Sequence, residues 1–206
     1  MVKINKLRLS LAALTVAMAG SIGMAVADTP PANPPAGSTL DQRIAQRKAE
    51  RGTALNDTDQ KRIVNTCRAA QAKIRSIEND EVTMLANRTQ VYSSIDAKLW
   101  IVTGQLKLAK QDTFQLEKQR LALADKTNNF QTVAANYKQT LDDSLVINCQ
   151  ADPNGFKALV DTARIYHDQL RTQSSDSHDY IVNTLKATLT DFANKLQPKS
   201  ADQGNQ

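Results

Sequence analysis

Two cysteines and two histidines give this chain most of its scope for redox, metal or nucleophilic chemistry. Cys67 and Cys149 lie far apart in the sequence, have no Cys-x-x-Cys spacing and have no histidine close by. That arrangement argues against a redox-active thiol pair, and two cysteines alone are too few for a zinc site. Since two lone cysteines pair in an oxidising compartment, we predict a structural disulfide between Cys67 and Cys149.

The remaining polar residues form no pattern that chemistry requires. On one helix, His167 and His178 would share a face but stand about 16 Å apart, too far to bind one metal ion. The carboxylates of Asp142 and Asp143 are adjacent, so they point to different faces of a helix. No Gly-rich phosphate loop, GxSxG or HExxH motif is present. We therefore predict a non-enzymatic protein with no catalytic, cofactor-binding or metal-binding residues.

Trp100 is the only tryptophan and the one candidate for a contact with a partner. It lies in the stretch KLWIVTGQL, with Gly104 one helical turn further on. The favoured interpretation is a packing anchor, where a third helix or a hairpin tip covers the ring. The alternative is an exposed apolar tip that contacts a partner through this side chain.

The first 27 residues match a secretory signal peptide. Lys3, Lys6 and Arg8 precede an uncharged apolar stretch, residues 9–24, and Ala25-Val26-Ala27 forms a small-x-small cleavage site. We expect cleavage there and export to the periplasm, the cell surface or the medium. An uncleaved leader that anchors the chain in a membrane through residues 9–27 is the alternative.

The charge balance excludes a strongly basic binding surface of the nucleic-acid type. Lys and Arg number 26 against 21 Asp and Glu, and three of the basic residues lie in the leader, so the mature chain carries about +2. The basic residues form no dense run, and the aromatic residues are not interleaved with them. We expect no nucleic-acid partner, and membrane association only through a retained leader.

Residues 28–57 are expected to form a Pro-rich spacer followed by a short helix. Four prolines among small residues in positions 28–38 favour an extended conformation that buries no apolar area. A helix over Thr39–Arg51, ending before Gly52, follows this spacer. The last nine residues, 198–206, are polar and are expected to be disordered.

Between these ends the chain is predicted to be all-helical. No proline lies between Ala36 and Asp152 or between Asn154 and Gln197, and Ala, Leu, Gln, Lys, Arg and Glu dominate. The predicted long-helix region spans 58–197, with helices over about 58–109, 113–148 and 153–196. The caps expected at their starts are Asp57 or Thr58, Asp112 with Gln115, and Asp152 before Pro153.

The apolar pattern predicts how these helices pack. Leu116, Leu123, Phe130 and Tyr137 follow at intervals of seven residues, the repeat of coiled-coil packing. Counted from residue 110, Cys67 lies 43 residues back and Cys149 lies 39 residues forward. The expected fold is an elongated antiparallel hairpin plus a third long helix, a three-helix coiled-coil-like bundle that the disulfide closes at its open end.

Several stretches resemble a set of uncharacterised exported helical proteins of candidate-phylum bacteria. The resemblance is carried by NTCRAAQAKI, NRTQVYSSID, DTFQLE, CQADPNGFKALVDTAR and YIVNTLKATL, and it covers roughly residues 60–197. It implies a Cys-x-x-Asp-Pro break before the last helix, and it implies no known activity and no functional residues. The turn Lys110-Gln111-Asp112 departs from the Gly-containing turn expected there.

Two functions follow as expectations. The first is a non-enzymatic scaffold or interaction module of the cell envelope, which presents a helix face or its tip to an envelope or extracellular protein. The alternative is a holdase-type periplasmic chaperone, which needs exposed apolar grooves. Self-association into a homo-oligomer stays open under either function.

Overall fold

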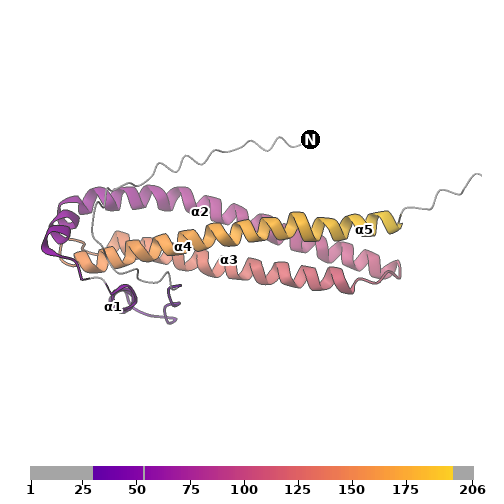
Figure 1. The fold of residues 1–206 in the computed structure, drawn as a ribbon, viewed down its shortest axis with the longest axis horizontal. Helices are drawn as coiled ribbons and strands as arrows, with labels where there is room; N and C mark the ends of the chain where they lie inside the picture. The colour runs from indigo at the N-terminus through magenta and orange to yellow at the C-terminus, as the bar shows by residue number, and fades with distance from the viewer. Residues whose placement is uncertain (1–29, 53, 197–206) are drawn as a thin grey trace, which may run out of the picture.

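The computed structural model describes residues 30–52 and 54–196 and contains helices but no strand in those ranges. The helices are α1 (Leu40–Arg51), α2 (Asp57–Leu108), α3 (Phe114–Val146), α4 (Pro153–Asp179), the π-helical segment η1 (Tyr180–Leu185) and α5 (Lys186–Leu196). Figure 1 shows the expected elongated bundle, which is confirmed: α2 and α3 form an antiparallel hairpin, and α4, η1 and α5 run along it as one continuous rod. The expected signal peptide, residues 1–27, and tail, residues 198–206, lie outside the described residues.

Two of the three expected helix starts differ from the prediction. Asn56, not Asp57 or Thr58, caps α2, and its side chain accepts a hydrogen bond from the backbone N–H of Asp59. Asn takes this role because its carbonyl oxygen sits one residue before the first helical position. Asp152 caps α4 as predicted, accepting from the Gly155 N–H at 2.8 Å.

The capping box expected at Asp112 and Gln115 does not form. Thr113 occupies the cap position without a side-chain cap bond, and its hydroxyl donates to Glu117 instead. The Asp112 carboxylate accepts from the Phe114 N–H at 3.0 Å, which satisfies one of the free donors at the start of α3.

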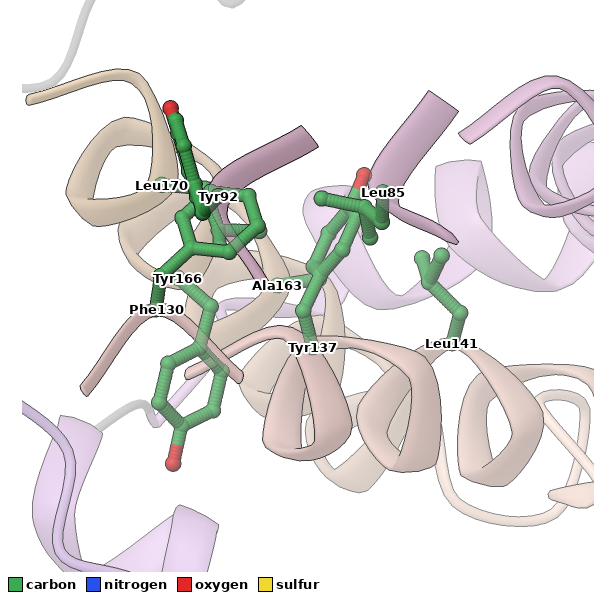
Figure 2. Packing of buried hydrophobic residues seen from close by; sticks show 8 residues of the cluster. All are labelled: Leu85, Tyr92, Phe130, Tyr137, Leu141, Ala163, Tyr166 and Leu170. Carbon is green, nitrogen blue, oxygen red and sulfur yellow. The ribbon is translucent and has the colours of Figure 1, made fainter. Parts of the chain in front are cut away.

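The core is a row of buried apolar side chains that runs along the hairpin. The seven-residue series of α3 is buried throughout, with Leu116, Leu123 and Phe130 at 0% exposure and Tyr137 at 4%. Figure 2 shows the middle of this row, where Tyr92 of α2 packs against Phe130 of α3. Their rings stand edge to face with centroids 5.6 Å apart, a favoured aromatic geometry.

The N-terminal segment is part of the packed structure, which corrects the expectation that residues 28–38 only span distance. Pro31 is buried, and the carbonyl of Ala32 accepts from Arg47 at 2.8 Å. Helix α1 packs on α4, and Arg47 also donates to the Tyr166 hydroxyl at 3.0 Å. Ile44 of α1 also packs into the apolar cluster of Phe156 and Leu159. Composition alone missed the docking of the N-terminal segment because it depends on contacts with residues more than a hundred positions away.

The third long helix changes its winding near its end. Residues of η1 form a π-helical segment between α4 and α5, where one long helix was expected. The hydroxyl of Tyr180 donates to the Gln119 carbonyl of α3 at 3.1 Å, and Leu185 is buried at 2% exposure. The π-helical segment therefore packs against α3 in the half of the hairpin nearer the turn, and α4 packs against α3 before it.

Candidate interaction surface

The cysteines form the predicted disulfide at the open end of the hairpin. Cys67 and Cys149 are bonded, with Cα atoms 5.9 Å apart. Both are buried in a cluster with Ile44, Ile147, Phe156 and Leu159. A disulfide enclosed by apolar side chains acts as a cross-link of the fold, and these residues contribute no surface for a partner.

The two histidines line an open groove between α2 and α4, but they stand apart from each other. His167 is partly buried, and its Nε2 lies 3.8 Å from the Glu81 carboxylate. Burial, with the Glu81 charge as a second cause, raises the pKa of the neighbouring Tyr137. In the described ranges no group of three or more His, Cys, Asp or Glu is placed to hold a metal ion.

The groove itself has a volume of about 1180 Å³ and a floor of core side chains. Leu85 and Leu170 are part of that floor. Its polar groups are occupied by one another: Arg88 donates to the Ser174 hydroxyl, which lies 3.3 Å from the Tyr92 hydroxyl. The Ser174 hydroxyl therefore binds a cation and a phenol rather than a base that would activate it as a nucleophile.

The other charged residues considered from the sequence serve the fold. Asp142 binds Lys138 at 2.8 Å on the surface of α3. Asp143 is buried and pairs with Arg43 of α1. The two carboxylates thus face different elements, as their adjacent positions on one helix predict.

Trp100 is exposed, so the favoured interpretation of a packing anchor is wrong. Its exposed fraction is 67%, and it belongs to a group of large apolar side chains close to the turn between α2 and α3. We call this group the end patch; its members, with exposed fractions, are Trp100 (67%), Ile101 (52%), Leu108 (86%), Phe114 (71%) and Leu121 (55%).

The end patch lies on the side of the hairpin that no other described helix covers. Leu99 and Leu106 of α2 are buried with Leu116 and Leu123 of α3. On this buried side, opposite the end patch, α5 covers them through Leu189 and Phe192. Ile101 and Leu108 point the opposite way because they sit two residues after the buried positions, about 200° round the helix. Phe114 and Leu121 lie two residues before the buried Leu116 and Leu123 of α3, so they also point away from the core.

The end patch has two apolar rows, Ile101 with Leu108 on α2 and Phe114 with Leu121 on α3, and charged side chains lie between them. A shallow groove of about 530 Å³ separates the rows and is lined by Trp100, Gly104 and Leu121 among others. Lys107 pairs with Glu117 at 2.6 Å and Arg120 pairs with Asp96 at 3.1 Å. The hydrogen bond from Lys107, with that from the Thr113 hydroxyl, lowers the pKa of Glu117.

The turn beside the end patch is held by backbone hydrogen bonds. The N–H of Gln111 binds the Leu106 carbonyl and the N–H of Lys110 binds the Lys107 carbonyl, which is the Schellman arrangement. Lys110 takes the left-handed conformation, φ 57°, where glycine was expected. The turn therefore projects a lysine side chain at the end of the rod.

Three exposed lysines border the end patch: Lys98, Lys110 and Lys118. Lys98 lies one helical turn before Ile101, and Lys118 lies one turn after Phe114 and before Leu121. Within residues 30–52 and 54–196 none of these three ammonium groups has an ion-pair partner. The one carboxylate of the turn, Asp112, accepts the N–H of Phe114.

Sequence reasoning singled out Trp100 and missed the other four members of the end patch. A signal was present, because Phe114 and Leu121 are seven residues apart and Ile101 and Leu108 repeat that interval. Each pair forms a second apolar row, on the side of its helix opposite the buried one. In a sequence, such a row is indistinguishable from a row that a further helix covers.

No protein-family model, curated protein or solved structure matches this chain. Among the described helices none has a stretch long and apolar enough to span a membrane.

Proposed function

We propose that this chain is a non-enzymatic scaffold of the cell envelope, a disulfide-closed rod that holds the end patch away from its cross-linked base for binding to an envelope component. The observation that carries the proposal is the exposure of the five large apolar side chains of the end patch beside one turn. Monomeric proteins rarely expose contiguous apolar patches beyond a few hundred Å², and larger ones mark interaction sites.

The disulfide supports the exported location. Protein disulfides persist in oxidising compartments and are rare in the cytosol, so the bonded Cys67–Cys149 pair accords with export. Cleavage of the leader and residence in the periplasm, at the cell surface or in the medium are parts of the proposal. The resemblance to exported helical proteins of candidate-phylum bacteria points the same way.

The test is retention of the purified protein on an isolated bacterial envelope fraction. Leu108→Asp combined with Phe114→Asp places two charges in the end patch, and we expect it to reduce the sedimented fraction at least fivefold. Val146→Asp is the matched control, because Val146 is equally exposed, at 71%, and lies at the opposite end of α3. Equal retention of the wild type and the end-patch variant contradicts the proposal.

A holdase-type chaperone is the second candidate, and the same exposed side chains favour it. A holdase binds many unfolded chains through apolar surface, without selecting a partner. At an equimolar ratio it slows the aggregation of an unfolding client such as reduced insulin, and the Leu108→Asp, Phe114→Asp variant loses that effect. Unchanged aggregation in the presence of the wild type excludes this candidate.

A further inference from the structure

We propose that the end patch binds the surface of bilayers that contain anionic lipid, with its apolar side chains in the interfacial layer and the lysines at its border on the headgroups. The inference rests on the proposed function and names the envelope component that the end patch contacts. It goes beyond the sequence-based expectation that only a retained leader brings the chain to a membrane.

Charge selects the partner. Lys98, Lys110 and Lys118 border the end patch without ion-pair partners in the described part of the chain. Asp112 is the one carboxylate of the turn, and Asp125 lies one helical turn beyond the end patch, on the side away from the turn. A lysine close to an anionic membrane surface attracts it by about 1 kcal/mol, roughly a fivefold gain in affinity. Two copies of this chain face to face would bring these lysines together, so the same charges oppose self-association through the end patch.

The middle of the end patch also favours a bilayer over a folded protein. Protein interfaces place apolar groups at the centre and polar groups at the rim. Here the Lys107–Glu117 and Asp96–Arg120 pairs lie between the two apolar rows. The interfacial layer of a membrane is polar and hydrated, so it accepts these ion pairs while the flanking rows reach towards the acyl chains.

The residue types fit that layer. Amphipathic helices at a membrane interface present Trp, Phe and Leu on the buried face and Lys or Arg on the polar face, and the end patch with its bordering lysines has this composition. Tryptophan is enriched at membrane interfaces, since its ring is apolar while its N–H can bind water. The four-carbon stems of the lysines let their ammonium groups reach the headgroups from the border of an inserted face.

The emission of Trp100 is a local probe, because the chain contains no other tryptophan. The full chain is titrated with vesicles of phosphatidylglycerol and phosphatidylethanolamine, or of phosphatidylcholine alone, at low and at high salt. We expect a blue shift of the emission with the anionic vesicles, at least tenfold weaker binding to the neutral ones, and a loss of binding as salt rises. A leader left on the chain can sediment the protein with vesicles, but it does not move Trp100 out of water.

Variants separate the charges from the apolar surface. Lys98→Glu, Lys110→Glu and Lys118→Glu combined should weaken binding to anionic vesicles at least tenfold. The matched control reverses the charge of three exposed basic residues of α2 that are distant from the turn in the sequence, and it should stay within about twofold. Its substitutions are Lys61→Glu, Arg68→Glu and Lys73→Glu. Circular dichroism melting checks that each variant keeps the helical fold.

Three results overturn the lipid proposal. The first is an unchanged Trp100 emission with excess anionic vesicles. The second is an emission shift that depends on protein concentration without lipid, which identifies a second copy as the occupant. The third is retention on the envelope fraction that needs Leu108 and Phe114 while pure vesicles do not bind, which identifies a protein partner and leaves the proposed function standing. A wild-type protein that binds neither the envelope fraction nor the vesicles gives the first of these results and removes both proposals.

Discussion

Arg43 of α1 holds the buried Asp143 of α3 through two hydrogen bonds. Its Nε and one terminal nitrogen donate to the two carboxylate oxygens at 2.7 and 2.6 Å, and Gln139 donates to the same carboxylate at 3.0 Å. The hydrogen bonds from Arg43 to Asp143, with the charge of that carboxylate, raise the pKa of Arg43. The pair joins the short N-terminal helix to the hairpin, so the segment expected to be a spacer is fastened by charge.

Removing Arg43 alone should lower the free energy of unfolding more than removing both charges of the Arg43–Asp143 pair. Arg43→Met leaves Asp143, 4% exposed, without its counter-charge, and should lower the free energy of unfolding by about 2–4 kcal/mol. Adding Asp143→Asn should restore at least half of that loss, since no buried charge remains. Urea unfolding of both variants measures the difference. Arg164→Met breaks an ion pair at the surface and should stay within about 1 kcal/mol.

Breaking the disulfide should weaken the base of the rod without altering the end patch. The bond joins residues 82 positions apart, so replacing both cysteines with serine should cost roughly 4 kcal/mol by the chain-entropy argument. Guanidinium unfolding measures the loss, and a reductant should reproduce it in the wild type alone. Trp100 emission of the folded variant should match the wild type. A changed emission contradicts the separation of the two ends.

Alanine substitutions at Gly155 and Gly104 should change the free energy of unfolding in opposite directions. At Gly155 a Cβ would meet the Asp152 carboxylate at 2.4 Å and Ile44 of α1 at 2.9 Å. Gly155→Ala should therefore lose the cap of α4 and disturb the docking of α1, at a cost of about 2–4 kcal/mol.

Gly104 provides the matched comparison. It lies within α2, and a Cβ there would have no neighbour within 4 Å. Gly104→Ala should raise the free energy of unfolding by about 0.5–1 kcal/mol, because alanine loses less backbone entropy in a helix. Thermal melting of the two variants should show shifts of opposite sign, and a destabilised Gly104→Ala variant would contradict the exposed placement of this face.

The left-handed residue at the turn offers a stabilising substitution. Lys110→Gly removes the steric strain of φ 57° and should raise the free energy of unfolding by about 1 kcal/mol. Lys110→Ile should lower it, because a β-branched side chain tolerates that conformation poorly. Chemical denaturation distinguishes the two directions. Equal free energies of unfolding for the two variants would contradict a left-handed conformation at Lys110.

Glu117 should give the end of the hairpin an acid-sensitive contribution to stability. Its folded pKa is lowered from the ordinary value of 4.5, so the stabilisation is present above that pH and is lost as the pH falls through the lowered pKa. Glu117→Gln should melt below the wild type at pH 7 and converge with it under strongly acidic conditions. A difference that persists unchanged at pH 2 contradicts an origin in this carboxylate.

The sequence by itself determined the class of fold, because proline and glycine spacing, helix propensity and the seven-residue apolar row act locally along the chain. The buried series from Leu116 to Tyr137 and the capping of α4 by Asp152 follow from such local rules. The cysteine pairing followed as well, because two lone cysteines pair in an oxidising compartment and lie at similar distances along the chain from the turn.

Tertiary structure alone decided which apolar row is covered and which arginines are buried. Ile101, Leu108, Phe114 and Leu121 are as apolar as the core residues beside them, and their exposure depends on α5 packing against the other side of the hairpin. Likewise, Arg43 pairs with Asp143, a hundred positions away in the sequence, and no local pattern predicts that ion pair. Burial and ion pairing between distant segments depend on the position of every helix at once, so only the folded chain settles them.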